Sequence, residues 1–433
     1  MRENPKMTDS LKRVAIIGGS RIPFCRSNTI YAEKTNLDML SASLQGLVDR
    51  FDLGGVQLDE VVAGAVTTHS KDWNLAREAT LSTTLSPLTP GITLQQACGT
   101  SLQAVLMLGA KIAAGQIDAG IAAGTDSTSD APIVFSRKFA RRMIRLSGAR
   151  SLQQRLKILR GIGVSELKPV PPANGEPRTL LSMGQHCERM AREWTIGRDE
   201  QDLLAATSHL RAAAAYEEGF YDELIVPWGG VCRDNNMRPD TSVEKLSKLR
   251  TAFDRGPEGT LTAGNSTPLT DGAASVLLAS ERWAKERGLP IQAYLTAGRS
   301  AAVDFVNDEG LLMAPTVAVS EMLTRAGLSL QDFDFYEIHE AFAAQTLCTL
   351  AAWESEEYCR SRLGLTQALG SIDRERMNVK GGSVAVGHPF AATGARITGA
   401  LSQMLTNKGS GRGLISVCTA GGMGVAAILE APN

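Results

Sequence analysis

The chain has 433 residues, of which 43% are hydrophobic and 21% charged, and its formal net charge is −1. This balance is ordinary for a globular protein and excludes a nucleic-acid binder that works through overall positive charge. No apolar run approaches the roughly 18 residues of a membrane-spanning helix, and the N-terminal residues lack the apolar stretch of an export signal. The odd number of cysteines, seven, predicts free thiols in a reducing, cytoplasmic compartment. No Cys or His pair has zinc-ligand spacing, so we expect no metal site.

Strand and helix patterns alternate along the first part of the chain. They lie in order at 13–24 (strand), 37–50 (helix), 61–68 (strand) and 74–84 (helix). Residues 91–127 then predict a strand, a turn, a long helix and a strand, and residues 378–424 repeat this order around a helix of small residues. Such alternation predicts a layered α/β fold. The repeated order favours two pseudosymmetric halves.

The region 132–250 differs in composition and predicts an inserted, mostly helical subdomain. No acidic residue lies between 131 and 165. The basic residues of this run are Arg137, Lys138, Arg141, Arg142, Arg145, Arg150, Arg155, Lys157 and Arg160. A solvated surface would explain the run, and so would a site for a polyanionic ligand, an acidic partner or a membrane surface. Two further helices are predicted at 182–194 and 198–219.

His388 lies in the glycine-rich segment 381–396, between a short apolar run and a helix pattern. The segment predicts a strand, a tight turn and a helix, because glycines permit a close backbone approach and Pro389 suits a first helical turn. A histidine here is either a satisfied core residue or an acid/base group. Candidate partner residues elsewhere in the chain must decide between these two interpretations of His388.

Cys98, in QQACGTS, follows an apolar strand pattern and precedes a helix. A sulfur at a helix N-terminus meets the positive end of the dipole, which predicts a lowered thiol pKa. A buried structural cysteine is the alternative. The strand–Cys–Gly–helix order resembles a nucleophile elbow and favours a nucleophile.

Two more residues share this kind of position. Cys418 ends a strand before a glycine-rich turn, where the amides of Ala420 and Gly421 could face an oxyanion. His339 lies at a strand-to-helix junction beside Glu340 and Phe342. Taken alone, each could be a core or capping residue. Together with Cys98 and His388 they suit acyl transfer with carbon–carbon bond chemistry and need no metal.

At this point the chain resembles the thiolase family over nearly its whole length. The motifs that carry the resemblance are QQACGTS, SMGQ, GTLTAGNSTPLTDGAA, EIHEAFAAQ, NVKGGSVAVGHPFAATGAR and CTAGGMG. The resemblance implies an α/β thiolase fold of two βαβαβαββ halves in an αβαβα arrangement, with an inserted, mostly helical loop domain. It divides the chain into 11–131 with 251–285, the insert 132–250, and 286–433. It also implies a homodimer or homotetramer.

The resemblance implies a role for each matching residue. Cys98 would be the acyl-accepting nucleophile, His388 would activate it and help hold the enolate oxygen of acetyl-CoA, and Cys418 would exchange the α-proton. The backbone amides of Cys98, Ala420 and Gly421 would form a second oxyanion hole. The residues expected to bind coenzyme A or the acyl chain are Met183, Ser266, Thr267 and Phe342. Coenzyme A is then a substrate, and no cofactor is implied.

Two departures from the usual pattern bear on specificity. His339 stands where many thiolases have Asn, which resembles the thiolase subunit of fatty-acid β-oxidation complexes. His186 replaces a small polar residue, which puts the acyl-length preference in doubt. Degradative thiolysis of 3-oxoacyl-CoA is expected, and docking to a hydratase/dehydrogenase subunit through the basic insert is a further hypothesis. The alternatives are biosynthetic acetoacetyl-CoA condensation, a ketoacyl synthase, for which Cys418 fits poorly, and a non-catalytic acyl-CoA-binding scaffold.

Overall fold

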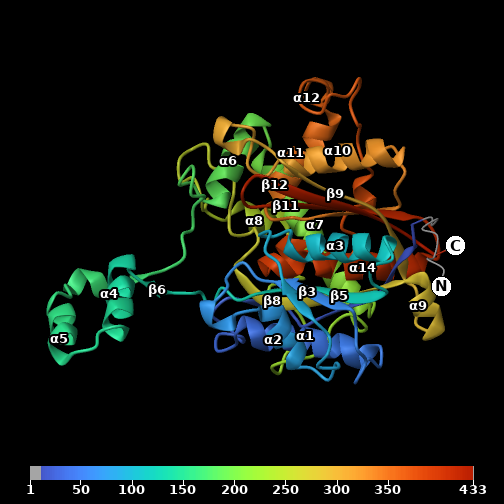
Figure 1. Ribbon diagram of the computed structural model, residues 1–433. Helices are drawn as coiled ribbons and strands as arrows, with labels where there is room; N and C mark the ends of the chain where they lie inside the picture. Colours follow the sequence, from blue (N-terminus) through green and yellow to red (C-terminus); the bar gives the residue numbers. More distant parts are fainter. Residues whose placement is uncertain (1–10, 433) are drawn as a thin grey trace.

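The computed structural model describes residues 11–432, and its body has five layers in the order αβαβα (Figure 1). Helices α3 (Thr100–Ala113) and α14 (Thr393–Lys408) form the central layer. A set of strands covers each side of this pair, and outer helices cover the strands. The layered α/β fold predicted from the alternating patterns is confirmed. No helix among residues 11–432 is long and apolar enough to cross a bilayer.

The first half runs β-α-β-α-β-α-β-β. Its elements are β1 (Val14–Arg21), α1 (Asn36–Arg50), β3 (Glu60–Gly64), α2 (Leu75–Leu81), β4 (Gly91–Thr93), α3, β5 (Ala119–Asp126) and β8 (Thr270–Ser280). Strands β3 and β5 are parallel, and β8 is antiparallel to β5 and β1. Helix α1 shows how the sequence sets these elements. Thr35 and Asp38 form a capping box at its start, and Leu40, Leu44 and Leu47 follow at helical spacing and are fully buried.

The second half repeats this order with one change. Its elements are β9 (Ala293–Ala302), α10 (Ala314–Ala326), β10 (Phe335–Ile338), α11 (Ala343–Glu354), α14, β11 (Arg412–Thr419) and β12 (Met423–Glu430). Where the first half has β4 beside β3, the second has a single bridge between Tyr336 and Met377. The strand predicted before His388 is wrong, because the short helix α13 (Ser383–Val386) lies there.

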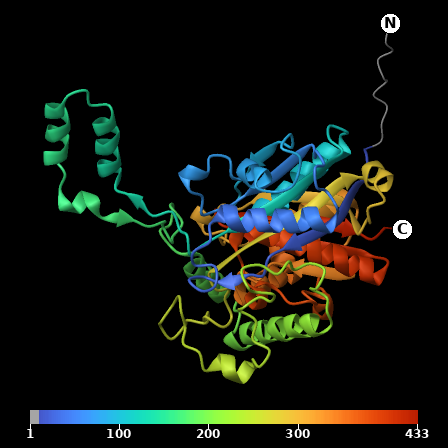
Figure 2. The same cartoon turned by 90° about the horizontal axis from the view of Figure 1, so that it is seen from below.

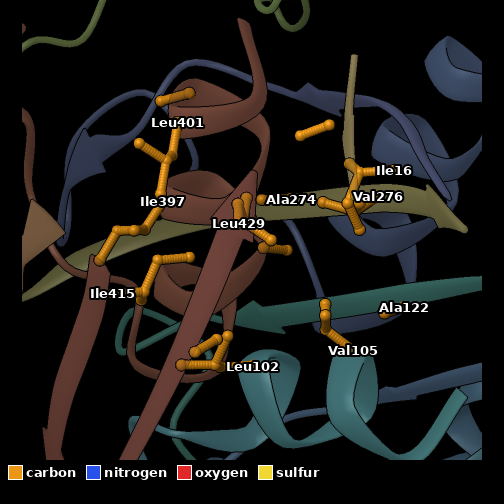
Figure 3. Packing of buried hydrophobic residues seen from close by; sticks show 14 of the residues in the cluster. Ile16, Leu102, Val105, Ala122, Ala274, Val276, Ile397, Leu401, Ile415 and Leu429 are labelled. Carbon is orange, nitrogen blue, oxygen red and sulfur yellow. The ribbon is translucent and has the colours of Figure 1, made fainter. Parts of the chain in front are cut away.

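The strands of both halves join into one ten-stranded sheet, in the main order β10-β11-β12-β9-β1-β8-β5-β3-β4, with β2 (Cys25–Arg26) beside β8. The junction is the antiparallel pairing of Val14–Ile16 with residues 293–295. Because the sheet bends around α3 and α14, its two halves face each other across them. Leu102 and Val105 of α3 and Ile397 and Leu401 of α14 fill the space between (Figure 3). This packing fixes the N-terminal ends of both helices side by side.

The insert has two parts that differ in how they pack. Helices α6 (Met183–Glu193), α7 (Arg198–Glu217) and α8 (Val243–Ser247) lie against the body. Residues 134–170, here called the arm, project away from it in both views (Figure 2). The arm consists of a short ribbon of β6 (Val134–Phe135) and β7 (Pro169–Val170) and the helices α4 (Arg137–Ser147) and α5 (Leu152–Arg160). No residue of α4 or α5 is buried.

Candidate active site

Cys98 lies two residues before α3, in a turn that brings the chain from β4 into the central layer. The preceding Ala97 has φ = +46°, an unfavourable value for a residue with a side chain. The following residue, Gly99, has no room for a Cβ, which would lie 2.8 Å from Thr419 and 2.9 Å from Val425. The glycine therefore lets the end of α3 approach β11 and β12, and it brings Cys98 beside the second half of the molecule.

His388 comes to the same place from the second half. Gly387, at φ = +102°, turns the chain after α13, and the backbone N–H of His388 donates to Thr270 Oγ1 at 2.7 Å. The Nδ1 atom of His388 lies 2.6 Å from Thr393 Oγ1. Its Nε2 atom lies 3.2 Å from Cys98 Sγ. The predicted Cys–His pair is therefore in hydrogen-bond contact, with the ring held from its other side by α14.

The pair is neutral at rest, which differs from the thiol acidity predicted from the helix N-terminus. Burial raises the pKa of the Cys98 thiol to about 12, although the amides of Ala420 and Cys98 itself hydrogen-bond to the sulfur and oppose the shift. Burial, helped by the positive charge of Arg396, lowers the pKa of His388 to about 3. Desolvation penalises both charged forms, and here it outweighs the helix dipole. His388 is thus placed to accept the proton as Cys98 attacks.

Cys418 and the turn after it also lie beside Cys98. Cys418 ends β11, is 1% exposed, and has a pKa raised well above the ordinary thiol value by burial and by the neighbouring Cys98. The amide of Ala420 points at the Cys98 sulfur. The amide of Gly421 instead donates to Glu176 Oε1 at 2.7 Å. The amide of Gly421, expected to serve the oxyanion hole, is therefore occupied by a carboxylate, whereas the amides of Ala420 and Cys98 lie close to the Cys98 sulfur.

His339 follows β10 directly and packs against His388. Its ring centroid lies 4.2 Å from that of His388, and its Nδ1 atom lies 2.8 Å from Ser383 Oγ. Its Nε2 atom is buried and has no hydrogen-bond partner among the described residues. Burial, followed by the charges of His388 and Arg396, keeps the pKa of His339 well below its usual value. The ring is therefore neutral and has one polar atom free for a ligand.

The residues expected to bind coenzyme A gather beside His339. Ser266 pairs with Phe342 through a backbone bridge, and the N–H and hydroxyl of Thr267 both donate to the Ala341 carbonyl. The Ser266 hydroxyl is buried without a partner among the described residues. Met183 and Phe342 belong to the apolar cluster that also contains Cys418. These side chains thus form a partly apolar wall next to the cysteines.

Comparisons with known proteins agree with this arrangement. The family model described as the thiolase N-terminal domain matches residues 14–282, and that of the thiolase C-terminal domain matches residues 289–431. The chain belongs to the thiolase family. It is 42% identical over 429 residues to a 3-ketoacyl-CoA thiolase of Vibrio cholerae, with 98% of each chain covered. It is also 42% identical over 425 residues to one of Aeromonas salmonicida, with 97% of each covered.

Solved structures of thiolases share the whole fold. The acetyl-CoA acetyltransferase of Bacillus anthracis superposes with a TM-score of 0.82 at 29% identity, covering 98% of this chain and 100% of that one. Human mitochondrial 3-ketoacyl-CoA thiolase in complex with CoA gives a TM-score of 0.81 at 26% identity, covering 98% and 99%. Within residues 11–432, no group of His, Cys, Asp and Glu side chains could hold a metal ion.

Several residues around this thiolase site had no role predicted from the sequence. Glu340 anchors the loop after β10 by accepting hydrogen bonds from Ser208 at 2.7 Å and Asn378 at 2.6 Å. Ser383 Oγ contacts the His339 ring, and Arg396 donates to Ser383 Oγ. The sequence holds one signal for Arg396, which is a single charged residue among the small and apolar residues of a predicted helix. An arginine that is buried in such a helix needs a partner, because this side chain is rarely fully buried unless it is paired.

Two histidines outside the site are also buried. His209 lies in the helix predicted at 198–219, where we expect it on the helix surface; this expectation is wrong, because it is 4% exposed and its Nδ1 accepts the backbone N–H of Arg238 at 3.2 Å. His186 lies 2.7 Å from Thr179 Oγ1 and edge-on to Phe305. It therefore supports the base of the insert, next to the loop that carries Glu176.

Proposed function

We propose that this thiolase cleaves 3-oxoacyl-CoA with free CoA, giving acetyl-CoA and a shortened acyl-CoA, in fatty-acid β-oxidation. The observation that carries the proposal is the Cys98 sulfur, which lies 3.2 Å from a neutral His388 and near Cys418. The 42% identity to relatives named 3-ketoacyl-CoA thiolase supports the same reaction. Coenzyme A is a substrate in this proposal, and no cofactor takes part.

In the first half-reaction, His388 Nε2 takes the proton of the Cys98 thiol while the sulfur bonds to the 3-keto carbon. The bond between that carbon and Cα then breaks, leaving an acyl-cysteine and the enolate of acetyl-CoA. Cys418, a neutral thiol because of its burial, gives its proton to Cα and releases acetyl-CoA. The Cys98 and Ala420 amides hold the oxygen of the tetrahedral intermediate. Such a donor contributes on the order of 10² to 10³ in rate.

In the second half-reaction, the Cys418 thiolate removes the proton of a new CoA thiol, whose sulfur attacks the acyl-cysteine carbonyl. The Cys98 sulfur leaves and recovers its proton from His388. Protons and charges balance over the cycle, so the enzyme returns to its neutral resting state. The groups that Met183, Ser266, Thr267 and Phe342 contribute beside the cysteines suit a pantetheine arm with an apolar chain.

The direct test is a thiolysis assay with free CoA and two substrates, acetoacetyl-CoA and a long-chain 3-oxoacyl-CoA. Release of acetyl-CoA from the long-chain substrate is expected. Turnover of acetoacetyl-CoA alone would favour the biosynthetic alternative, which the likeness to an acetyl-CoA acetyltransferase supports. Absence of turnover with both substrates would overturn the proposal in favour of a non-catalytic acyl-CoA-binding subunit.

The arm suits contact with an acidic partner. It exposes apolar side chains, among them Phe135 (57% exposed), Ile144 (71%) and Leu152 (73%), between basic ones. Its one acidic residue, Glu166, is already paired with Lys138 and Arg142. Exposed apolar groups amid unpaired positive charge favour docking on an acidic surface of a hydratase/dehydrogenase subunit or an anionic membrane.

The double variant Arg141→Glu, Arg145→Glu removes this charge without breaking the Glu166 pairs, and Arg141→Lys, Arg145→Lys is its control. Loss of co-elution with the subunit, or of binding to anionic vesicles, would identify which surface the arm contacts. If the reversed variant associates with both as the control does, the arm has neither role.

We also infer a homodimer formed through the edge strand β4. Ile92 of β4 is 38% exposed, and Leu88 and Trp73 nearby are 71% and 94% exposed. An unpaired edge with apolar neighbours is a usual place for a second chain to add. Sedimentation equilibrium should give a dimer, or a tetramer of such dimers, and Ile92→Lys should shift it towards monomer; an unchanged mass would refute this interface.

The compartment and the domain division complete the proposal. All seven cysteines are free thiols, which supports a reducing, cytoplasmic location. We divide the chain into the nucleophile half (11–131 with 251–285), the insert (132–250) and the half that carries both catalytic histidines (286–433). The change of architecture at the base of the arm and the boundary between the two family models support this division.

A further inference from the structure

A chain of buried polar groups runs behind His339, away from the cysteines. Arg396 of α14 donates from Nη2 to Ser383 Oγ at 2.8 Å. The same oxygen lies 2.8 Å from Nδ1 of His339. Glu337 of β10 lies 3.6 Å from Arg396, and both of their side chains are 3% exposed. Ionic groups buried this deeply are costly, so their position behind an active-site ring calls for a reason beyond packing.

Only one arrangement of protons gives the hydrogen and the oxygen of the Ser383 hydroxyl a partner each. Arg396 only donates, so it uses one lone pair of Ser383 Oγ. If His339 also donated from Nδ1, the buried Ser383 hydroxyl hydrogen would have no partner among the described residues. If the hydroxyl instead donates to Nδ1, both contacts are made and the hydroxyl hydrogen also has a partner. His339, which is neutral, must then carry its single proton on Nε2.

We propose that Ser383 and Arg396 are positioning residues that hold His339 as the Nε2–H tautomer, so that it donates to the thioester oxygen of the departing enolate. The atom that would donate is the one without a partner: His339 Nε2 is buried, and its ring lies against His388. Once His388 has taken the Cys98 proton, two ring N–H groups from adjacent histidines converge on the developing charge. The inference rests on the proposed thiolysis, because the oxygen in question forms only when the carbon–carbon bond breaks.

The two half-reactions separate this role from a structural one. Cleavage of 3-oxoacyl-CoA produces the enolate, whereas exchange of an acyl group between acyl-CoA and labelled CoA passes through Cys98 without one. Ser383→Ala should therefore lower kcat for cleavage at least about tenfold, with little change in KM, and leave the exchange rate within about twofold of the parent. Ser383→Thr, which keeps the hydroxyl, should restore cleavage.

Ser402→Ala is the matched control, because Ser402 lies on α14, is fully buried and hydrogen-bonds to Gln292 at 2.9 Å. Ser402→Ala should not lower the cleavage rate more than the exchange rate. Nitrogen NMR of histidine-labelled enzyme gives a second readout, with the His339 signals assigned by the variant His339→Asn. The parent should show an unprotonated Nδ1 and a protonated Nε2, and Ser383→Ala or Arg396→Lys should show a mixture of tautomers.

Equal loss of cleavage and exchange in Ser383→Ala would overturn the proposal, as would an Nδ1–H tautomer in the parent enzyme. A parent enzyme that exchanges acyl groups but never cleaves 3-oxoacyl-CoA would instead refute the proposed function. The two failures are thus distinguishable.

Discussion

The neutral state of the Cys98–His388 pair is a sharp prediction, because an ion pair of the kind found in many cysteine enzymes would behave differently. With the pKa of the thiol raised to about 12 by burial, about one molecule in 10⁴ holds a thiolate at pH 8. With the pKa of His388 lowered to about 3, also by burial, the imidazole carries no charge at that pH. The thiolate therefore forms during attack and does not wait in the resting enzyme.

The assay is the ultraviolet absorbance of thiolate, followed from pH 5 to 9 in the parent and in Cys98→Ala. The two curves should coincide, since the removed thiol does not ionise in this range. Cys232→Ala is the control for the loss of one exposed cysteine. A step of one thiolate near or below pH 7 that disappears in Cys98→Ala would refute the argument that desolvation dominates this site.

Three other changes test the chemistry and the packing. Cys418→Ala should still acquire an acyl group from a simple acyl-CoA but lose exchange of the acetyl α-protons with solvent, and retained exchange would remove its acid/base role. Gly394→Ala should lower the free energy of unfolding by about 1–3 kcal/mol in urea titrations, because the new Cβ would lie 2.3 Å from the Leu102 amide where α14 crosses α3. Gly148→Ala, with no atom closer than 3.8 Å, is the control, and equal effects would contradict the packing argument. Burial lowers the pKa of His209 to about 4, below the ordinary value, so its contribution to stability is present above pH 6.5 and lost as pH falls towards 4. His209→Gln should remove up to about 1.4 kcal/mol per pH unit of that dependence, and an unchanged slope would contradict it.

The layered fold and the repeated halves follow from sequence patterns that are local. Apolar runs, helix caps and glycine turns recur in the same order in both halves, so the positions of Cys98, His388 and Cys418 at element ends could be predicted. The conformation of the segment before His388 could not be predicted in this way. Its apolar run, typical of a strand, forms α13 because Glu340 accepts the Val384 amide and Asn236 donates to the Val384 and Ala385 carbonyls. Side chains distant in sequence satisfy this backbone in place of a neighbouring strand.

The electrostatics of the site also lay outside the sequence. The N-terminal position of Cys98 on a helix was visible, but the depth of its burial was not, and burial decides the sign of the pKa shift. No sequence signal indicates that the Gly421 amide donates a hydrogen bond to Glu176, which lies 245 positions earlier in the chain. No sequence pattern indicates that Arg396 reaches His339 through Ser383, and only the fold shows it. Long-range contacts of this kind determine which predicted groups are free to act.

In the proposed reaction, Cys98 carries the acyl group between the two substrates. The most direct test of this role is peptide mass spectrometry of the enzyme after incubation with a long-chain 3-oxoacyl-CoA in the absence of free CoA, followed by a chase with CoA. We expect an acyl group, two carbons shorter than the substrate chain, on Cys98, its release by CoA, and no acylation of Cys98→Ala. An acyl group on another residue, or turnover by Cys98→Ala, would contradict this role.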